Sequence, residues 1–361
     1  MLPYVLRSVQ GGLPIALFFL NLQAAPDRQS FAKEDRPIEG VPIEAFDLAD
    51  DNLTIELWAR SPLIYSPVAM DFDARGRLWL TEGIDYNQGL RVQSGRSIMV
   101  VEDRDGDGKA DHSHPFVTEK NLRHAPLGIA VFDNRIVLSA TPSIIVYTDV
   151  DRNAVFDPKI DQREVFLTGF QNKNHDHTVH AVVGAPSGQW HFSFGNCGAD
   201  LKTKDGRRYL AGCYYGYPEA IGRKSWDGEV YVGGMTMRIN PDGTGLMPTG
   251  ENMRNPHDMF VTSHGDVLQS DNDDPAHSRS SWIMEHANMG YADLRDGSRS
   301  WEEVAKSWEE PAGWNKNRRF SRSHWRENYP GAFPPGSIYG AGSPTGNLFV
   351  EDDTLGLAGT Y

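Results

Sequence analysis

Short apolar runs separated by tight polar turns recur along the chain, and the first set shows the pattern. Residues 66–72 lead to a turn at 74–76, residues 78–83 run back, and residues 97–102 supply a third apolar run. Runs of about four to eight such residues, bounded by Gly, Pro, Asn or Asp, are typical of β-strands. The unit therefore predicts a strand, a tight turn, a second strand, a loop and a third strand, which is the order of elements in an antiparallel four-stranded blade.

This unit returns several times, which predicts a repeat architecture. Its copies begin near Pro67, Pro126, Val179, Pro256 and Pro344. The spacing exceeds the ~40–50 residues of compact propeller repeats, so loops must be inserted, and 197–227 and 300–336 stand out. We therefore expect an all-β, six-bladed β-propeller. The chain would supply about four to five blades and is expected to be truncated at its C-terminus, inside the fifth copy.

Composition supports a turn-rich β protein and narrows its partners. Gly 36 and Pro 22 are high counts for a helical protein, and the aromatic residues favour strands. The formal net charge of −14 argues against a nucleic-acid partner, which would need a concentrated basic surface. We therefore expect no nucleic-acid binding.

The first residues predict export. Arg7 precedes an apolar run at 12–20, and residues 22–24 offer a small-residue cleavage site, a pattern typical of a secretory signal peptide. An uncleaved N-terminal anchor is the alternative. The expected boundaries are 1–24 for the signal peptide, 25–52 for a polar N-terminal arm and 53–361 for the propeller. No second apolar run reaches spanning length, so we expect no transmembrane span in the mature chain and a periplasmic or extracellular location.

The two cysteines, Cys197 and Cys213, lie in one segment rich in Gly and Tyr. In an exported protein such a pair most simply forms one disulfide that pins a long loop. Two free thiols are the alternative, because spacing alone does not establish the Cα separation. The chain has no Cys-x-x-Cys-His segment and therefore no c-type haem attachment.

Two acidic loops carry the most specific metal signal. Carboxylates at every second position place several hard oxygens around one point, as Ca²⁺ requires. The candidate ligands are Asp103, Asp105, Asp107 and Asp111 in the first loop and Asp149, Asp151, Asn153 and Asp157 in the second. The twelfth position is His114 or Ile160 where an EF-hand has a bidentate Glu, so neither loop is an EF-hand. The alternative is a solvated acidic turn without metal.

Histidines cluster in the segment Asn174-His175-Asp176-His177-Thr178-Val179-His180. A His pair with a carboxylate could bind zinc or another transition metal, and a single His could act as a general base. Loop histidines making ordinary hydrogen bonds are the third interpretation. The residues alone leave these three interpretations open.

A second polar group stands at the entrance of the fourth unit. Pro256 fixes its own φ and pushes Asn255 toward an extended conformation, so Arg254 and Asn255 sit at a strand entrance beside His257. The hairpin that follows ends in the carboxylates Asp271, Asp273 and Asp274. We expect the ends of this hairpin to form a polar mouth.

Several of these motifs resemble the soluble quinoprotein glucose/sorbosone dehydrogenases. The resemblance rests on residues 254–256, 259–260, 268–270 and 288–291. It implies a six-bladed propeller that binds pyrroloquinoline quinone (PQQ) with Ca²⁺. The units from 67 to 157 more closely resemble the membrane-bound dehydrogenase propeller domain of large secreted planctomycete and verrucomicrobial proteins, where a cytochrome c domain often follows.

Carried over residue by residue, the resemblance implies a site. His177 would take the proton of a sugar or related alcohol as hydride moves to the quinone, with cytochrome c as an electron acceptor. Arg254 and Asn255 would hold the cofactor, and an Arg fork suits its carboxylates. His257 stands at that site where the family has a glutamine, and Asp274-Pro275 replaces the Gly-Pro that offers carbonyls to Ca²⁺.

Two further functions stay open beside this dehydrogenase hypothesis. The first is a non-catalytic propeller that binds a glycan or a partner protein and uses the acidic loops as Ca²⁺ sites. The second is a His-based metal hydrolase, which has the least support because no second ligand set accompanies residues 175–180. Fold alone does not choose among them, since propellers host many functions.

Overall fold

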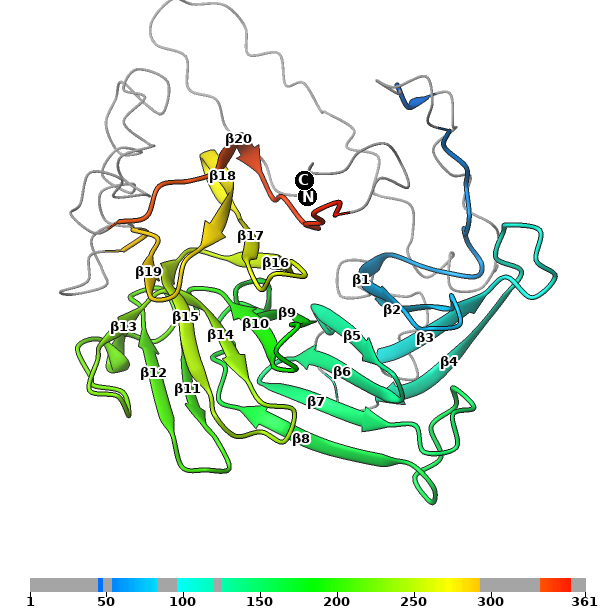
Figure 1. Ribbon diagram of the computed structural model, residues 1–361, viewed down its shortest axis with the longest axis horizontal. Helices are drawn as coiled ribbons and strands as arrows, with labels where there is room; N and C mark the ends of the chain where they lie inside the picture. Colours follow the sequence, from blue (N-terminus) through cyan, green and yellow to red (C-terminus); the bar gives the residue numbers. More distant parts are fainter. Residues whose placement is uncertain are drawn as a thin grey trace, which may run out of the picture.

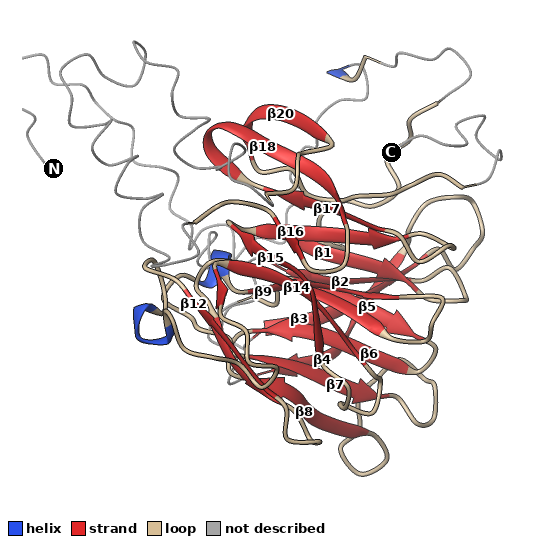
Figure 2. Cartoon of the chain, turned by 60° about the vertical axis from the view of Figure 1, so that its left-hand side comes forward, coloured by secondary structure: helices blue, strands red, loops and turns tan. Residues whose placement is uncertain are grey.

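A computed structural model describes residues 45–47, 54–82, 96–119, 122, 125–292 and 332–351. These residues form mainly strands and connecting loops, and their short 3₁₀ helices include η3 (His175–His177) and η4 (Pro218–Ala220) (Figure 2). The strands are β1 (Pro67–Phe72), β2 (Leu78–Glu82), β3 (Arg96–Glu102), β4 (His112–Glu119), β5 (Gly128–Phe132), β6 (Arg135–Ala140), β7 (Ser143–Thr148), β8 (Gln162–Thr168), β9 (Val179–Gly184), β10 (Trp190–Phe194), β11 (Ala199–Lys202), β12 (Arg208–Gly212), β13 (Tyr231–Val232), β14 (Gly234–Ile239), β15 (Met247–Met253), β16 (Pro256–Val261), β17 (Val267–Asp271), β18 (Asp273–Ile283), β19 (Ala287–Asn288) and β20 (Ser337–Gly342). Among the described residues no helix is long and apolar enough to cross a membrane.

Four sheets repeat one topology. Their strand orders are β1-β2-β3-β4, β5-β6-β7-β8, β9-β10-β14-β15 and β16-β17-β18-β20, each joined by antiparallel pairs. The first strands of successive sheets contact one another, β1 with β5, β5 with β9, and β9 with β16 (Figure 1). The fold is therefore all-β and propeller-like, as the repeated unit predicts. The described residues contain four such blades, and the total of six stays a prediction.

The third blade carries an additional sheet. Between β10 and β14 the chain forms β11, β12 and β13, and β19 adds to β15 as a parallel edge strand. This small sheet accounts for the predicted insertion at 197–227. The insertion at 300–336, the signal peptide at 1–24 and most of the arm at 25–52 lie outside the described residues.

The turn between the first two strands explains why the unit repeats. Gly76, Gly188 and Gly265 stand at this turn in the first, third and fourth blades, with φ of 77°, 81° and 93°. Asp133, with φ of 58°, takes the place in the second blade. A left-handed residue here lets the strands reverse in a tight turn, and Gly adopts that conformation without strain. The four predicted turns are confirmed by the antiparallel pairing of their flanking strands.

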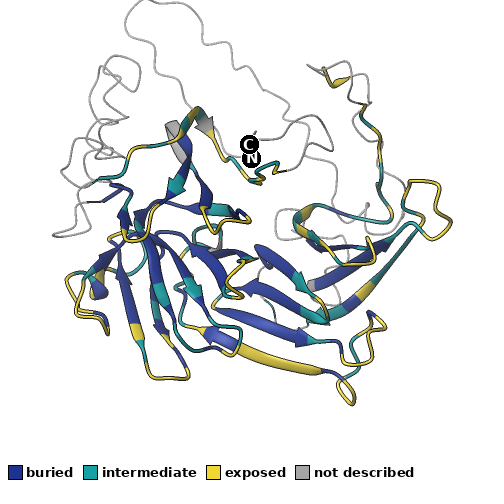
Figure 3. Cartoon of the chain, viewed as in Figure 1, coloured by how far each residue is buried: buried dark blue, intermediate teal, exposed yellow. Residues whose placement is uncertain are grey.

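The core lies between the blades. All five residues of β2, of β10 and of β17 are buried, because neighbouring elements cover both faces of these strands (Figure 3). Aromatic rings fill the space between sheets: Phe116 of β4 packs edge-on against Tyr147 of β7, and Phe132 stacks on Trp190 with 5.2 Å between ring centroids. Such pairs add to the free energy gained by burying their apolar area.

A buried hydroxyl joins each blade to the next. Thr81 Oγ1 donates to the carbonyl of Pro126 at 2.9 Å, Ser139 Oγ donates to the carbonyl of His180, and Ser193 Oγ donates to the carbonyl of Pro256 at 3.2 Å. In each case the donor lies on the second strand of one blade and the acceptor lies at the start of the next blade. We call these three contacts the hydroxyl latches. They fix where each new blade begins.

We expect Thr81→Val to lower the free energy of unfolding by about 1–3 kcal/mol. Valine keeps the shape of the threonine but leaves a buried carbonyl without this donor. Urea denaturation followed by circular dichroism measures the change. Ser187→Ala, on the exposed turn of the third blade, is the matched control and should change stability by less than about 0.5 kcal/mol. A Thr81→Val protein as stable as the wild type would contradict the role given to the latches.

Candidate functional site

The polar groups predicted at the fourth hairpin gather at the start of two inner strands. η3 leads into β9, and residues 254 and 255 lead into β16, which lies beside β9. Residues 195–197, which follow β10, bind both segments through backbone hydrogen bonds: Gly195 N to Thr178 O at 2.8 Å, Cys197 N to His177 O at 3.1 Å and Asn196 N to Arg254 O at 2.8 Å. The two motifs that the sequence places 75 residues apart are thus one site.

His177 is oriented by a neighbouring amide. Its Nδ1 lies 2.6 Å from Asn196 Oδ1, and the amide nitrogen of Asn196 donates to Tyr291 OH at 3.1 Å. Since Asn196 presents its oxygen, Nδ1 of His177 carries the proton and Nε2 carries the basic lone pair. The ring is partly exposed and lies 5.3 Å from the ring of Tyr215. This is the arrangement that a general base requires.

Asn255 fixes the opposite tautomer on His180. Its Nδ2 donates to the backbone carbonyl of Asp176 at 2.9 Å, and a carbonyl can only accept. Its Oδ1 therefore faces His180 Nε2, at 2.9 Å, and Nε2 of His180 carries the proton. Gly195 allows this contact, because a Cβ at that position would stand 2.4 Å from Asn255 Oδ1. Both amide atoms of Asn255 thus bind protein groups, and a direct cofactor contact stays a prediction.

Two imidazoles at the site are held uncharged. Burial lowers the pKa of His180 well below its ordinary value, and the nearby His257 lowers it further. Burial also lowers the pKa of His257. Their ring centroids lie 4.7 Å apart. Nδ1 of His180 is buried and has no hydrogen-bond partner among the described residues, so a bare lone pair is held beside His257.

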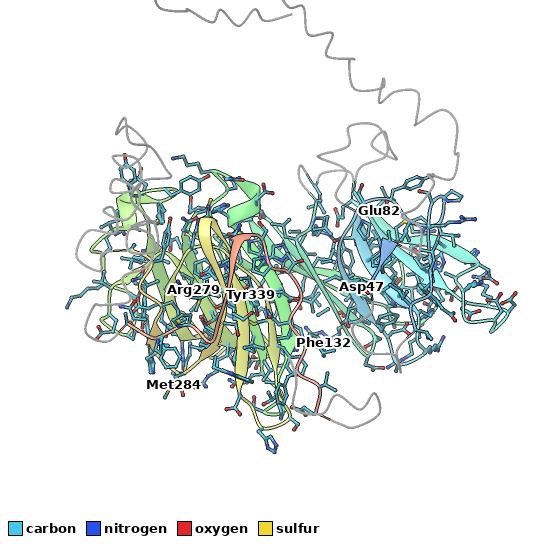
Figure 4. The ribbon with its side chains drawn as sticks, turned by 90° about the horizontal axis from the view of Figure 1, so that it is seen from above. Asp47, Glu82, Phe132, Arg279, Met284 and Tyr339 are labelled. Atoms are coloured by element: carbon cyan, nitrogen blue, oxygen red, sulfur yellow. The ribbon has the colours of Figure 1, made fainter. Side chains whose placement is uncertain are left out.

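Asp271 anchors the strand entrance. Its two oxygens accept from the backbone N–H of Arg254 at 3.0 Å and of Asn255 at 2.6 Å. Burial raises the pKa of the carboxyl to about 7, although these hydrogen bonds and the charges of Arg254 and Arg279 act to lower it. Arg279 lies opposite Asp271 across the β17–β18 pair, and Figure 4 shows it in the fourth blade near Tyr339. The carboxyl fixes the backbone that carries Arg254 and Asn255.

Arg254 is itself buried, at 3% exposure. Its Nη1 donates to Asn272 Oδ1 at 2.5 Å and to the Asn272 carbonyl at 3.2 Å. His257 differs, since it lines a cavity of about 910 Å³ bounded by the four inner strands and residues 345–348. His257 is thus the predicted cofactor residue that faces open space at the centre of the blades. The side chains of His175 and of Asp274-Pro275 lie outside the described part of the chain.

The first acidic loop assembles most of its predicted ligands. Carboxylate oxygens of Asp103, Asp105 and Asp107 lie within 4.8 Å of one another. Asp103 also accepts from the backbone N–H of Gly106 and Gly108, which curls the loop. Asp111 is outside this triplet and accepts from Arg104 N at 3.2 Å. Metal binding here stays a prediction.

The second acidic loop assembles a different set from the predicted one. Asp149 and Asp151 come together with Asp161, which lies past the nine-residue window that the spacing suggested. Asn153 and Asp157 instead accept from the backbone N–H groups of Val155 and Lys159, at 2.7 and 2.9 Å. The alternating spacing of acidic residues stops before Asp161, so spacing alone does not predict Asp161 as a ligand. Its acidic side chain, in the same loop, is the signal that could identify it.

The predicted disulfide between Cys197 and Cys213 is not formed, and both residues are free, buried thiols. Cys197 Sγ donates to the carbonyl of Asn174, the N-cap residue of η3, at 3.2 Å. Its thiol therefore helps to hold η3 in place and forms no cross-link. Burial raises the pKa of each thiol to about 11, which keeps both protonated and unreactive.

Fold and site together define an all-β, propeller-like protein with a buried polar site at the start of its third and fourth inner strands. Residues 43–329 match the model of the family described as "Domain of unknown function (DUF7133)", and the chain belongs to that family. No curated protein matches the chain.

Among solved structures the chain is similar to several propeller proteins at low identity. A Trichoderma reesei structure of Carbohydrate-Active Enzymes Family AA12 shares 13% identity over 68% of this chain and 60% of that chain, with a TM-score of 0.45. The PQQ domain of pyranose dehydrogenase from Coprinopsis cinerea shares 15% sequence identity over 64% of this chain and 55% of that chain, with a TM-score of 0.42. The PQQ-bound aldose sugar dehydrogenase from Streptomyces coelicolor shares 14% sequence identity over 65% of this chain and 65% of that chain, with a TM-score of 0.42. The chain thus spans less than two thirds of each of these proteins.

The uncharged imidazoles make stability depend on pH. The pKa of His257 is lower in the folded than in the unfolded state, so its contribution is complete above about pH 6.5 and is lost as the pH falls. We expect His257→Gln to lose less stability than the wild type between pH 7.5 and pH 5. The difference is at most about 2 kcal/mol, since one pH unit is worth about 1.4 kcal/mol.

Urea midpoints of both proteins at the two pH values measure this effect. Asp271 acts in the opposite sense, because its raised pKa favours the folded state as the pH falls below about 7. Comparing wild type and variant cancels that contribution. Equal losses in the two proteins would contradict the uncharged state of His257.

Proposed function

We propose that the chain is an exported dehydrogenase that oxidises a hydroxyl of a sugar or related alcohol with the help of PQQ. The observation that carries the proposal is the orientation of His177, whose Nδ1 is held by Asn196 at 2.6 Å so that Nε2 is the basic nitrogen. A base fixed in this tautomer can take the hydroxyl proton of a substrate without first reorganising. The resemblance of residues 254–256 to the quinoprotein motif supplies the cofactor hypothesis.

The residues at the site fit an anionic quinone. Such a group needs positive charge and N–H donors, and the guanidinium of Arg254 is held at the strand entrance by Asn272. Lys173 adds a second cation, with Nζ 5.2 Å from the ring of Tyr215 beside His177. His257 borders the central cavity without adding a charge of its own. We propose that His257, which borders the cavity, and the exposed Lys173 contact the cofactor. For the buried Arg254, the cofactor role is what the family resemblance implies.

Bound at this site, the quinone would supply the acceptor for the hydride of the substrate carbon. The chain's own residues supply the rest. His177 holds the hydroxyl proton at Nε2, and Asn196 keeps the ring in place through Nδ1 as the positive charge develops. Asn255 fixes the ring of His180, and Asp271 fixes the backbone of Arg254, so both residues hold the site in shape. The electrons would pass on to a cytochrome c, and Ca²⁺ would occupy the acidic loop at Asp103, Asp105 and Asp107.

Reconstitution tests the proposal. The full chain is purified, loaded with PQQ and Ca²⁺, and assayed for dye reduction over a panel of sugars and alcohols. We expect His177→Ala to lower kcat by about 10²–10⁴-fold, the loss typical of a missing general base. His264→Ala, on an exposed turn, is the matched control and should leave kcat unchanged.

The absorbance spectrum of the bound quinone separates the outcomes. A His177→Ala protein that still binds the quinone but turns over slowly supports the assigned role. Quinone binding with unchanged turnover in the variant would contradict it. A wild-type protein that neither binds the quinone nor reduces the dye would refute the dehydrogenase and favour a propeller that binds a glycan or a partner protein.

A further inference from the structure

A second cluster of ligating side chains lies on the first blade, away from the site described above. Glu102 ends β3 and His112 begins β4, and the two residues are directly paired in the sheet. His114 follows two residues later, on the same face as His112. One ligand atom from each of the three residues lies within 4.8 Å of the others. The ring centroids of the two histidines are 5.4 Å apart.

The tautomer of His114 is fixed by the neighbouring blade. Its Nε2 lies 3.0 Å from the backbone carbonyl of Ala154. Because a carbonyl only accepts, Nε2 carries the proton and Nδ1 carries the lone pair. A ring N–H bound to a backbone carbonyl is the usual support of a histidine that ligates a metal through its other nitrogen.

That lone pair has no partner within the described residues. Nδ1 of His114 is buried and accepts no hydrogen bond there. A buried acceptor left in this state destabilises the fold, and a cation placed between the three side chains would satisfy it. The bare nitrogen is thus an observation independent of the spacing of the three side chains.

Glu102 also makes an ion pair with Arg104. Arg104 binds Glu102 Oε2 through Nε at 2.9 Å and Nη2 at 2.7 Å. The Arg104 side chain is 55% exposed, and an ion pair with such an exposed partner is weak because water screens its charges. The other oxygen, Oε1, lies 3.9 Å from Nη1 of Arg77. Arg104 therefore does not prevent Glu102 from ligating a cation.

We propose that Glu102, His112 and His114 bind a divalent transition-metal ion of the zinc class. Imidazole nitrogens suit Zn²⁺, Cu²⁺ and Ni²⁺, whereas Ca²⁺ takes oxygen ligands. Two His and one Glu are three of the four ligands of a tetrahedral site, which leaves one position for water. The site is separate from the acidic triplet Asp103, Asp105 and Asp107 that follows Glu102.

Metal binding would also strengthen a junction between blades. Ala154 belongs to the second acidic loop and is fully buried, and the next residue but one, Phe156, donates its N–H to the Phe116 carbonyl at 2.9 Å. A metal on Nδ1 of His114 polarises the ring and strengthens the Nε2–H contact to Ala154. Binding should therefore raise the melting temperature as well as show a ligand signature.

Titration of the metal-stripped full chain tests the proposal. Zn²⁺ is followed by calorimetry and Co²⁺ by its visible absorption, which reports nitrogen and oxygen ligands. We expect one Zn²⁺ per chain at this site. His112→Ala and His114→Ala should each weaken that binding by more than about 100-fold, since even the loss of an outer-shell partner costs about 10–100-fold.

Three further variants keep the test specific. His264→Ala and Asp103→Asn should leave Zn²⁺ affinity unchanged, because the first lies on an exposed turn and the second belongs to the acidic triplet. Glu102→Gln should weaken binding while leaving the circular dichroism spectrum intact. Absence of Zn²⁺ binding by the folded wild type, or equal affinity in wild type and the His112→Ala/His114→Ala double variant, would overturn the proposal.

Discussion

The contact on which the structure depends is the buried hydroxyl that joins each blade to the next. A propeller blade packs against its neighbours through two apolar faces, and the hydrophobic effect that drives this packing has no preferred direction. Thr81, Ser139 and Ser193 place one directional hydrogen bond on the second strand of their blades, where most residues are buried. Two of the three acceptors, the carbonyls of His180 and Pro256, belong to the strands that carry the candidate site. The position of the site therefore follows from the contacts that hold the blades together.

Within that frame, amides decide the chemistry of the histidines. Asn196 and Asn255 each face one imidazole and leave opposite nitrogens protonated on His177 and His180. His180 is fully buried, which keeps it uncharged, while His177 stays partly open. His180 thus has a structural role at the site, whereas His177 can exchange a proton. The proposed metal cluster on the first blade follows the same rule, with the Ala154 carbonyl in the role of the amides.

The repeated unit could be predicted from the sequence because its causes are local. Turn residues such as Gly76 and Gly265 and the apolar runs beside them each fix a hairpin without help from distant residues. The grouping of His177 with Arg254 and His257 came from a family resemblance. Asn196 and Asp271 could not be found in this way, because their roles depend on which residues the fold brings opposite them. The same holds for Asp161 and for Cys197, whose thiol binds the Asn174 carbonyl and forms no disulfide.

The central claim is that the fold presents Nε2 of His177 as a basic nitrogen at the mouth of the inner strands. Nitrogen-15 NMR of the imidazole rings at neutral pH reads the tautomer of each histidine directly, with His177→Ala and His180→Gln to assign the signals. The geometry predicts a proton on Nδ1 and none on Nε2 for His177, and the reverse for His180. A His177 protonated on Nε2 and bare on Nδ1 would contradict the claim, because its basic nitrogen would then face Asn196 instead of a substrate.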